Sequence, residues 1–132
     1  MKKVIFVSHV ILNPNESRHK EKMKILLKDM VNIFAEAGVG IIQMPFLDCD
    51  SYKNPKELKS FSCLITKQIK NYLRSDCHVL AILDTNKSRR FYNEMENEMS
   101  KKRFQIPIIG IDPENLTESM RKIQMLLRYC DF

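Results

Sequence analysis

Four short apolar segments alternate along the chain with four amphipathic segments. The apolar segments are almost continuous, as in strands of a parallel sheet that is covered on both faces. They occupy residues 3–8, 39–44, 77–83 and 106–111. In the amphipathic segments, apolar residues recur every three or four positions, which places them on one face of a helix. These predicted helices lie within residues 23–37, 55–73, 89–103 and 113–130.

Residues at the ends of these segments support the predicted boundaries. Gly38 follows the first helix, where glycine commonly ends a helix because it tolerates a positive φ. Asn54 and Pro55 suit the cap and first turn of the second helix, and Asp112 followed by Pro113 marks the start of the fourth. Segment 46–54 is predicted to be a loop, and segment 9–18, which follows the first strand, is polar.

Strictly alternating strands and helices indicate an α/β fold. Right-handed crossovers between the strands give a three-layer, Rossmann-like (flavodoxin-like) domain with a four-stranded parallel sheet. We expect the strand order 2-1-3-4. The length of 132 residues suits one domain spanning 1–132.

Charge and targeting signals narrow the class of protein. The net charge is +6, but the lysines are spread along every helix among acidic residues, which disfavours nucleic-acid binding. No apolar run is long enough to span a membrane. The basic start and the apolar run at 4–7 are interrupted at Ser8 and His9, unlike a signal peptide. We therefore expect a cytoplasmic protein.

The cysteines carry no metal-site spacing. None of Cys49, Cys63, Cys77 and Cys130 belongs to a C-x-x-C pair, so no metal site is predicted. In the cytoplasm these thiols are expected to be reduced. Cys63 and Cys77 are predicted to be small core residues.

Ligands of open α/β sheets bind beyond the carboxyl ends of the strands, near the switch in strand order. The predicted ligand-binding residues follow the first three strands and are His9, Asn13, Asn15, Gln43, Asp84 and Asn86. Of these, His9 and Asp84 are also candidate catalytic residues. Ser8, Asp48, Thr85 and Asp112 follow the strands as well.

Each candidate also fits a structural role. His9 suits a strand-end hydrogen bond, and Asn13-Pro14-Asn15 suits a turn. Asp84 suits the cap of the third helix, and Asp112 is predicted mainly to cap the fourth. The chain contains no G-x-G-x-x-G, Walker A or G-x-S-x-G motif, which disfavours dinucleotide, ATP and hydrolase sites.

Three segments resemble one known family, the short-chain relatives of the thiouracil desulfidases, most of which are described as a domain of unknown function. Residues 8–15 read S-H-V-I-L-N-P-N where the family typically has S-H-C-L-L-N-x-N. Residues 38–45 read G-V-G-I-I-Q-M-P beside G-V-G-I-I-Q-L-P, and 106–112 read I-P-I-I-G-I-D beside I-P-F-I-G-I-D. The helices between them align in register, so the resemblance covers nearly the whole chain.

The resemblance implies an iron–sulfur enzyme, but the chain departs from the family at its ligands. The three family cysteines that would hold a [4Fe-4S] cluster fall on Val10, on Phe46 and in segment 84–88, which reads D-T-N-K-S. Iron in such clusters needs thiolate ligands, and Cys49 would supply only one. The loops after the second and third strands are also shortened. The resemblance therefore implies a divergent member without the cluster or any other cofactor.

Three functional hypotheses follow. In the first, a cluster-free relative binds a small polar ligand, with a nucleobase as one possibility, or a protein partner at the strand ends. In the second, a small-molecule enzyme (desulfidase-like, transferase or hydrolase) uses His9 as general acid or base with Asp84 orienting it. In the third, an interaction subunit or homo-oligomer associates through Phe91, Tyr92, Met95 and Met99, although such a stripe more often forms a core face.

Overall fold

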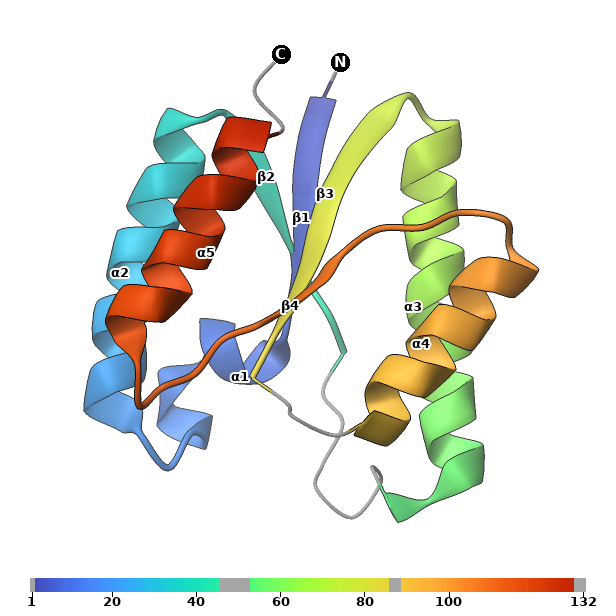
Figure 1. Cartoon of the computed structure of the whole chain (residues 1–132), viewed down its shortest axis with the longest axis horizontal. Coiled ribbons are helices and arrows are strands. Elements are labelled where there is room, and N and C mark those ends of the chain that lie inside the picture. Colours follow the sequence, from blue (N-terminus) through green and yellow to red (C-terminus); the bar gives the residue numbers. More distant parts are fainter. Residues whose placement is uncertain (1, 46–52, 86–88, 130–132) are drawn as a thin grey trace.

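All four strands run parallel in one sheet with the order β2-β1-β3-β4, which confirms the predicted Rossmann-like order (Figure 1). The computed structural model describes residues 2–45, 53–85 and 89–129. The strands are β1 (Lys2–Val7), β2 (Val39–Gln43), β3 (Cys77–Asp84) and β4 (Ile108–Gly110).

Helices cover both faces of the sheet and complete three layers. One face carries α2 (Lys20–Glu36) and α5 (Leu116–Tyr129), and the other carries α3 (Pro55–Arg74) and α4 (Arg89–Lys101) (Figure 1). After β1 the chain forms a single helical turn, α1 (His9–Leu12), and a 3-10 helix at Pro14–Glu16. The polar segment 9–18 thus contains two short helical turns.

Alternating side chains of the strands build two separate cores. In β1, Ile5 and Val7 pack with α2 and α5, whereas Val4 and Phe6 pack with α3 and α4. This is the period of two expected for a strand. Phe91, Met95 and Met99 of α4 are fully buried in the second core. The apolar stripe of α4 is thus a core face, and only its polar neighbour Tyr92 remains half-buried.

Two predicted helix ends are confirmed and one is wrong. Gly38 has a φ of 71° after α2, and the Asn54 side chain accepts hydrogen bonds from Lys56 N (3.0 Å) and Glu57 N (3.3 Å) at the start of α3. The fourth helix does not begin at Asp112. Asp112 Oδ1 accepts from Glu114 N and closes a turn, and Asn115 Oδ1 caps α5 instead.

An arginine occupies a backbone position at the end of α4 that favours glycine. Arg103 has a φ of 61°. Its N–H donates to Ser100 O, and Phe104 N–H donates to Met99 O, both at 3.1 Å. These two bonds form the Schellman motif, in which glycine is common because a Cβ destabilises the left-handed conformation. Arg103 therefore keeps a side chain at the expense of local stability.

We expect Arg103→Gly to raise the free energy of unfolding by about 0.5–1 kcal/mol, because relief of backbone strain exceeds the added freedom of the unfolded chain. Urea denaturation followed by circular dichroism measures the change. Arg103→Ala is the matched control, since it removes the guanidinium and keeps the Cβ. An equal gain in both variants would assign the effect to charge and refute the backbone explanation.

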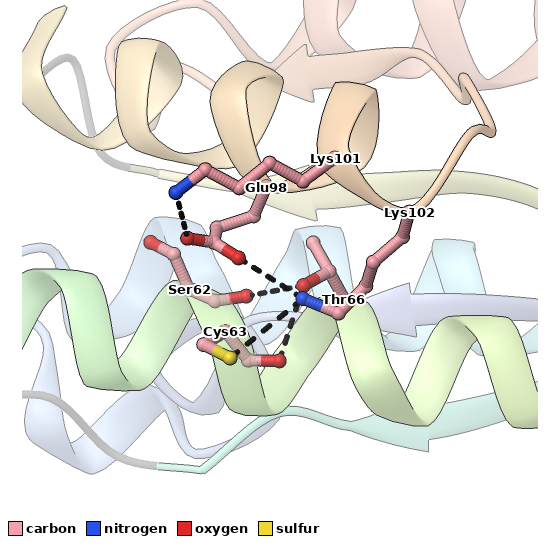
Figure 2. A network of polar contacts seen from close by, with 6 residues as sticks. All are labelled: Ser62, Cys63, Thr66, Glu98, Lys101 and Lys102. Atoms are coloured by element: carbon pink, nitrogen blue, oxygen red, sulfur yellow. Dashed lines mark hydrogen bonds and ion pairs between the residues drawn. The ribbon is translucent and has the colours of Figure 1, made fainter.

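A buried carboxylate links α4 to the segment that follows it. The side chain of Glu98 is 5% exposed and accepts from Lys101 Nζ (3.3 Å) and Lys102 Nζ (3.0 Å). Figure 2 shows Lys102 extended over α3, where its Nζ also lies 3.6 Å from Cys63 Sγ. Glu98 thus holds two lysine side chains at the α3–α4 interface.

The two partners have opposite pKa shifts. The hydrogen bond from Lys102, helped by Lys101, lowers the pKa of Glu98 although burial opposes this shift. Burial by itself would lower the pKa of Lys102, but the hydrogen bond and charge of Glu98 raise it overall. Glu98 therefore contributes stability above its ordinary pKa of 4.5, and this contribution is lost as the pH falls through its lower folded value.

At neutral pH we expect Glu98→Gln to lose about 2 kcal/mol of unfolding free energy, because a hydrogen-bonded buried charge is removed and Lys102 is left without its partner. The difference from the wild type should shrink as the pH falls below 4.5. Urea denaturation between neutral and acidic pH measures both effects. Glu96→Gln, on the exposed side of α4, should change little; a constant penalty at every pH for Glu98→Gln would exclude the ionic contribution.

Candidate functional site

The carboxyl ends of β1, β2 and β3 meet at one edge of the sheet. Val7 of β1 stands in register with Gln43 of β2 and Leu83 of β3. The pairing continues past the strand ends, because Met44 N donates to Val7 O and Ser8 N donates to Leu83 O, both at 2.9 Å. Residues that follow the three strands are therefore held side by side.

The structure brings His9, Asn13 and Gln43 together at this edge. Gln43 Nε2 lies 2.9 Å from His9 Nδ1, and Asn13 Nδ2 lies 3.3 Å from the same nitrogen. Amide nitrogens only donate, so His9 Nδ1 accepts.

The single turn of α1 explains why Asn13 reaches back to His9. Asn13 N and Asn13 Nδ2 both donate to His9 O, at 2.9 and 3.0 Å, and close the turn. Pro14 starts the next turn, where its missing N–H costs nothing. The turn that was predicted at Asn13-Pro14-Asn15 is therefore also the local structure that places the Asn13 side chain for its predicted binding role.

These amides present a mixed polar edge. Within the described residues, neither Asn13 Oδ1 nor Gln43 Oε1 accepts a hydrogen bond, since their contacts to His9 use the nitrogens. Gln43 is exposed, and His9 and Asn13 are half-buried. Two carbonyl acceptors and the one remaining N–H of the Gln43 amide therefore lie beside the imidazole. Such groups can pair with the donors and acceptors of a small polar molecule.

Asp84 lies at the same edge but faces the other helical layer. Its side chain is 1% exposed, and alternation along β3 places it on the face of Ile82, toward α3 and α4. Burial, and secondly the charge of Asp84, raise the pKa of Tyr92 in α4. Tyr92 Oη also lies 3.4 Å from where a Cβ on Gly110, the β4 partner of Asp84, would stand. Tyr92 is thus a neutral polar group beside Asp84.

Sequence reasoning placed Tyr92 in the apolar stripe of α4 and did not predict its position beside Asp84. The signal that identifies it is its position in the first turn of the helix after β3, because that turn starts at the carboxyl edge of the sheet. Of the remaining predicted residues, Asn15 is exposed and forms no hydrogen bond with His9, Asn13 or Gln43 in the described part of the chain. Asp48, Thr85 and Asn86 were also candidates. Asp48 and Asn86 lie outside the described residues.

No hydrogen bond or ion pair joins Asp84 to His9 among the residues that the structure describes. Instead, two amides hold the imidazole at Nδ1. His9 is therefore oriented by neutral groups at the atom where a catalytic carboxylate would usually bind.

The described thiols lie away from this edge. Cys77 starts β3, roughly 23 Å along the strand from Asp84. Cys63 is exposed on α3, so its predicted core position is wrong. It lies two residues from both Phe61 and Ile65, and positions two apart on a helix face different directions.

A cluster does not fit the described part of this edge. Val10, at the first family cysteine position, is a half-buried residue of α1 and has no metal-binding atom. Phe46, Cys49 and Cys130 lie outside the described residues. In the parts of the chain that are described, no three or more His, Cys, Asp or Glu residues gather as a possible metal site.

No family model, curated protein or solved structure matches the chain. No helix within 2–45, 53–85 or 89–129 is both long and apolar enough to cross a membrane.

Proposed function

We propose that this chain is a ligand-binding domain that holds a small polar molecule at the carboxyl ends of β1 and β2. The observation that carries the proposal is the convergence of the Asn13 and Gln43 amides on His9 Nδ1, at 3.3 and 2.9 Å. Their nitrogens are oriented by the imidazole, so their carbonyl oxygens are held in place before a ligand arrives. Such preorganisation lowers the entropic cost of binding.

A ligand with a planar amide edge suits these groups best. The N–H groups of such an edge would donate to Asn13 Oδ1 and Gln43 Oε1, and its carbonyl would accept from the remaining N–H of Gln43. Nucleobases and related ring amides have this pattern of donors and acceptors.

The resemblance to the desulfidase relatives supports the same assignment. His9 and Asn13 belong to the first matching segment and Gln43 to the second, and these residues are neighbours in the fold. Matching residues that meet at one place fit an inherited binding site. On this proposal the chain is a cluster-free relative in which polar side chains bind the ligand without iron.

Two amides contact the imidazole at Nδ1, and these contacts favour binding over the enzymatic alternative. A general base oriented by Asp84 would be expected to donate a ring N–H hydrogen bond to its carboxylate. In the described residues, the contacts of Nδ1 come from Asn13 and Gln43 instead.

Uracil is the first probe, and 1,3-dimethyluracil is its control because its nitrogens cannot donate. We expect uracil to bind saturably in calorimetric titration, and Gln43→Leu to weaken it roughly tenfold through the loss of about one hydrogen bond. Gln124→Leu changes an exposed glutamine of α5 and should leave the affinity unaltered. Equal binding of both pyrimidines, or an equal loss in both variants, would reject this site.

Iron analysis tests the absence of the cluster separately. Protein purified and reconstituted without oxygen should contain no stoichiometric iron or acid-labile sulfide, because Val10 and Phe46 replace two thiolates that such a cluster needs. The double substitution Val10→Cys with Phe46→Cys is the comparison variant, since it restores cysteine at two of the three family positions. Stoichiometric iron and sulfide in the unaltered chain would overturn the cluster-free assignment.

A further inference from the structure

A pocket lined almost entirely by cations lies between the C-terminal parts of α3 and α4. Its volume is about 380 Å³. The charged residues that line it are Lys67, Lys70, Arg74, Lys101, Lys102 and Arg103, and Asn71 adds one amide. Because α3 runs back to the start of β3, its C-terminal end lies at the opposite end of the sheet from α1, which His9 begins (Figure 1).

Few negative groups compensate this charge. Glu98 pairs with Lys101 and Lys102 and neutralises one unit. Within the described residues, Lys67, Arg74 and Arg103 form no ion pair. The pocket therefore carries about five uncompensated positive charges, counted from ordinary protonation states at neutral pH.

Capping of helix ends does not account for so many cations. Lys70 Nζ donates to Lys102 O at 2.8 Å, which is one such cap. The C-terminus of each helix carries roughly half a negative charge, so two helices supply about one. Lys67, Lys70 and Arg74 also share one face of α3 at spacings of three and four, where like charges repel. An excess of positive charge remains after both carboxylate and dipoles are counted.

The backbone at Arg103 is a second, independent observation. Arg103 occupies the left-handed position of a Schellman motif, where glycine would relieve strain. Strained backbone positions concentrate at functional sites. The side chain kept there is a guanidinium that lines the pocket, and guanidinium groups bind phosphate oxygens in pairs.

Glu98 also arranges part of the pocket in advance. Its two oxygens hold the ammonium groups of Lys101 and Lys102, and Lys102 is further positioned beside Cys63 Sγ (Figure 2). Lysines fixed by a buried carboxylate lose less freedom when an anion binds. The remaining cations of the pocket lie on α3 and at Arg103, across the same cavity.

We propose that this pocket binds a small ligand that carries two or more linked phosphate groups. About four excess charges remain after Glu98 and the two helix dipoles are counted, and they match several phosphate oxygens better than a single monovalent anion. The volume of 380 Å³ falls among small-molecule sites, which span about 300–1,000 Å³. None of its described lining residues is aromatic, so it offers no stacking platform for single-stranded nucleic acid.

Inorganic pyrophosphate is the probe, titrated calorimetrically into the full chain at physiological ionic strength, with orthophosphate and sulfate as comparison anions. We expect pyrophosphate to bind at least about tenfold more tightly than either, because a second phosphate adds charge-assisted hydrogen bonds. Amide chemical shifts should change at 67–74 and 101–103 and leave 9–13 unaltered. Changes centred on 9–13 would overturn the assignment.

The variant Lys67→Gln with Arg103→Gly removes two pocket cations. Because Arg103→Gly is expected to stabilise the fold, weaker binding cannot be ascribed to unfolding. Lys56→Gln with Lys59→Gln removes two exposed charges of α3 outside the pocket and is the matched control. We expect a loss of about tenfold or more for the double variant and less than about twofold for the control.

Equal losses in the double variant and the control would show attraction by the general basic surface and overturn the proposal. Equal affinities for pyrophosphate, orthophosphate and sulfate would do the same. Oligodeoxythymidylates test the macromolecular alternative: an affinity that rises with their length while pyrophosphate fails to bind would assign the surface to nucleic acid instead.

Discussion

The burial of β1 between β2, β3 and both helical layers is the constraint on which the rest of this structure depends. Ile5, Phe6 and Val7 are completely buried, two toward one core and one toward the other. A shift of one residue in register would exchange the two faces and place each side chain in the wrong core. The register is therefore strongly determined, and it brings the chain after β1 beside the end of β2. The contact between His9 and Gln43 is a direct consequence.

Residue patterns predicted the sheet because its main determinants are local in sequence. Continuous apolar strands, helical periodicity, Gly38 and the Asn54–Pro55 cap each act within a few residues. The start of α5 was mispredicted because Asp112 and Asn115 are both good caps. Asp112 Oδ1 bonds Glu114 N in a preceding turn, and Asn115 takes the cap. Which of the two nearby residues caps the helix depends on the direction in which the chain leaves β4. A short stretch of sequence does not reveal that direction.

The candidate site was predictable to the extent that it follows from strand order. His9, Asn13 and Gln43 meet because consecutive strand ends meet, whereas the orientation of Asp84 depends on the pleat of β3 and on packing with α4. Tyr92 was missed for the same reason. The cationic pocket was missed because 67–74 and 101–103 are separate in sequence, and only the packing of α3 against α4 joins them. Lysines that look dispersed along a chain can therefore form one cluster.

The two ends of a parallel sheet differ electrostatically, because the helix N-termini lie at one end and the helix C-termini at the other. Helix N-termini gather at the carboxyl end, which is where Rossmann-like folds usually bind phosphate through a glycine-rich turn after the first strand. The turn directly after β1 contains none of the three glycines of this chain. It contains His9 and Asn13 instead. At the opposite end the helix dipoles oppose anions, so only side-chain cations could attract phosphate. A pocket that does so must carry more positive charge than a dipole-assisted site, and the six cations between α3 and α4 meet that requirement.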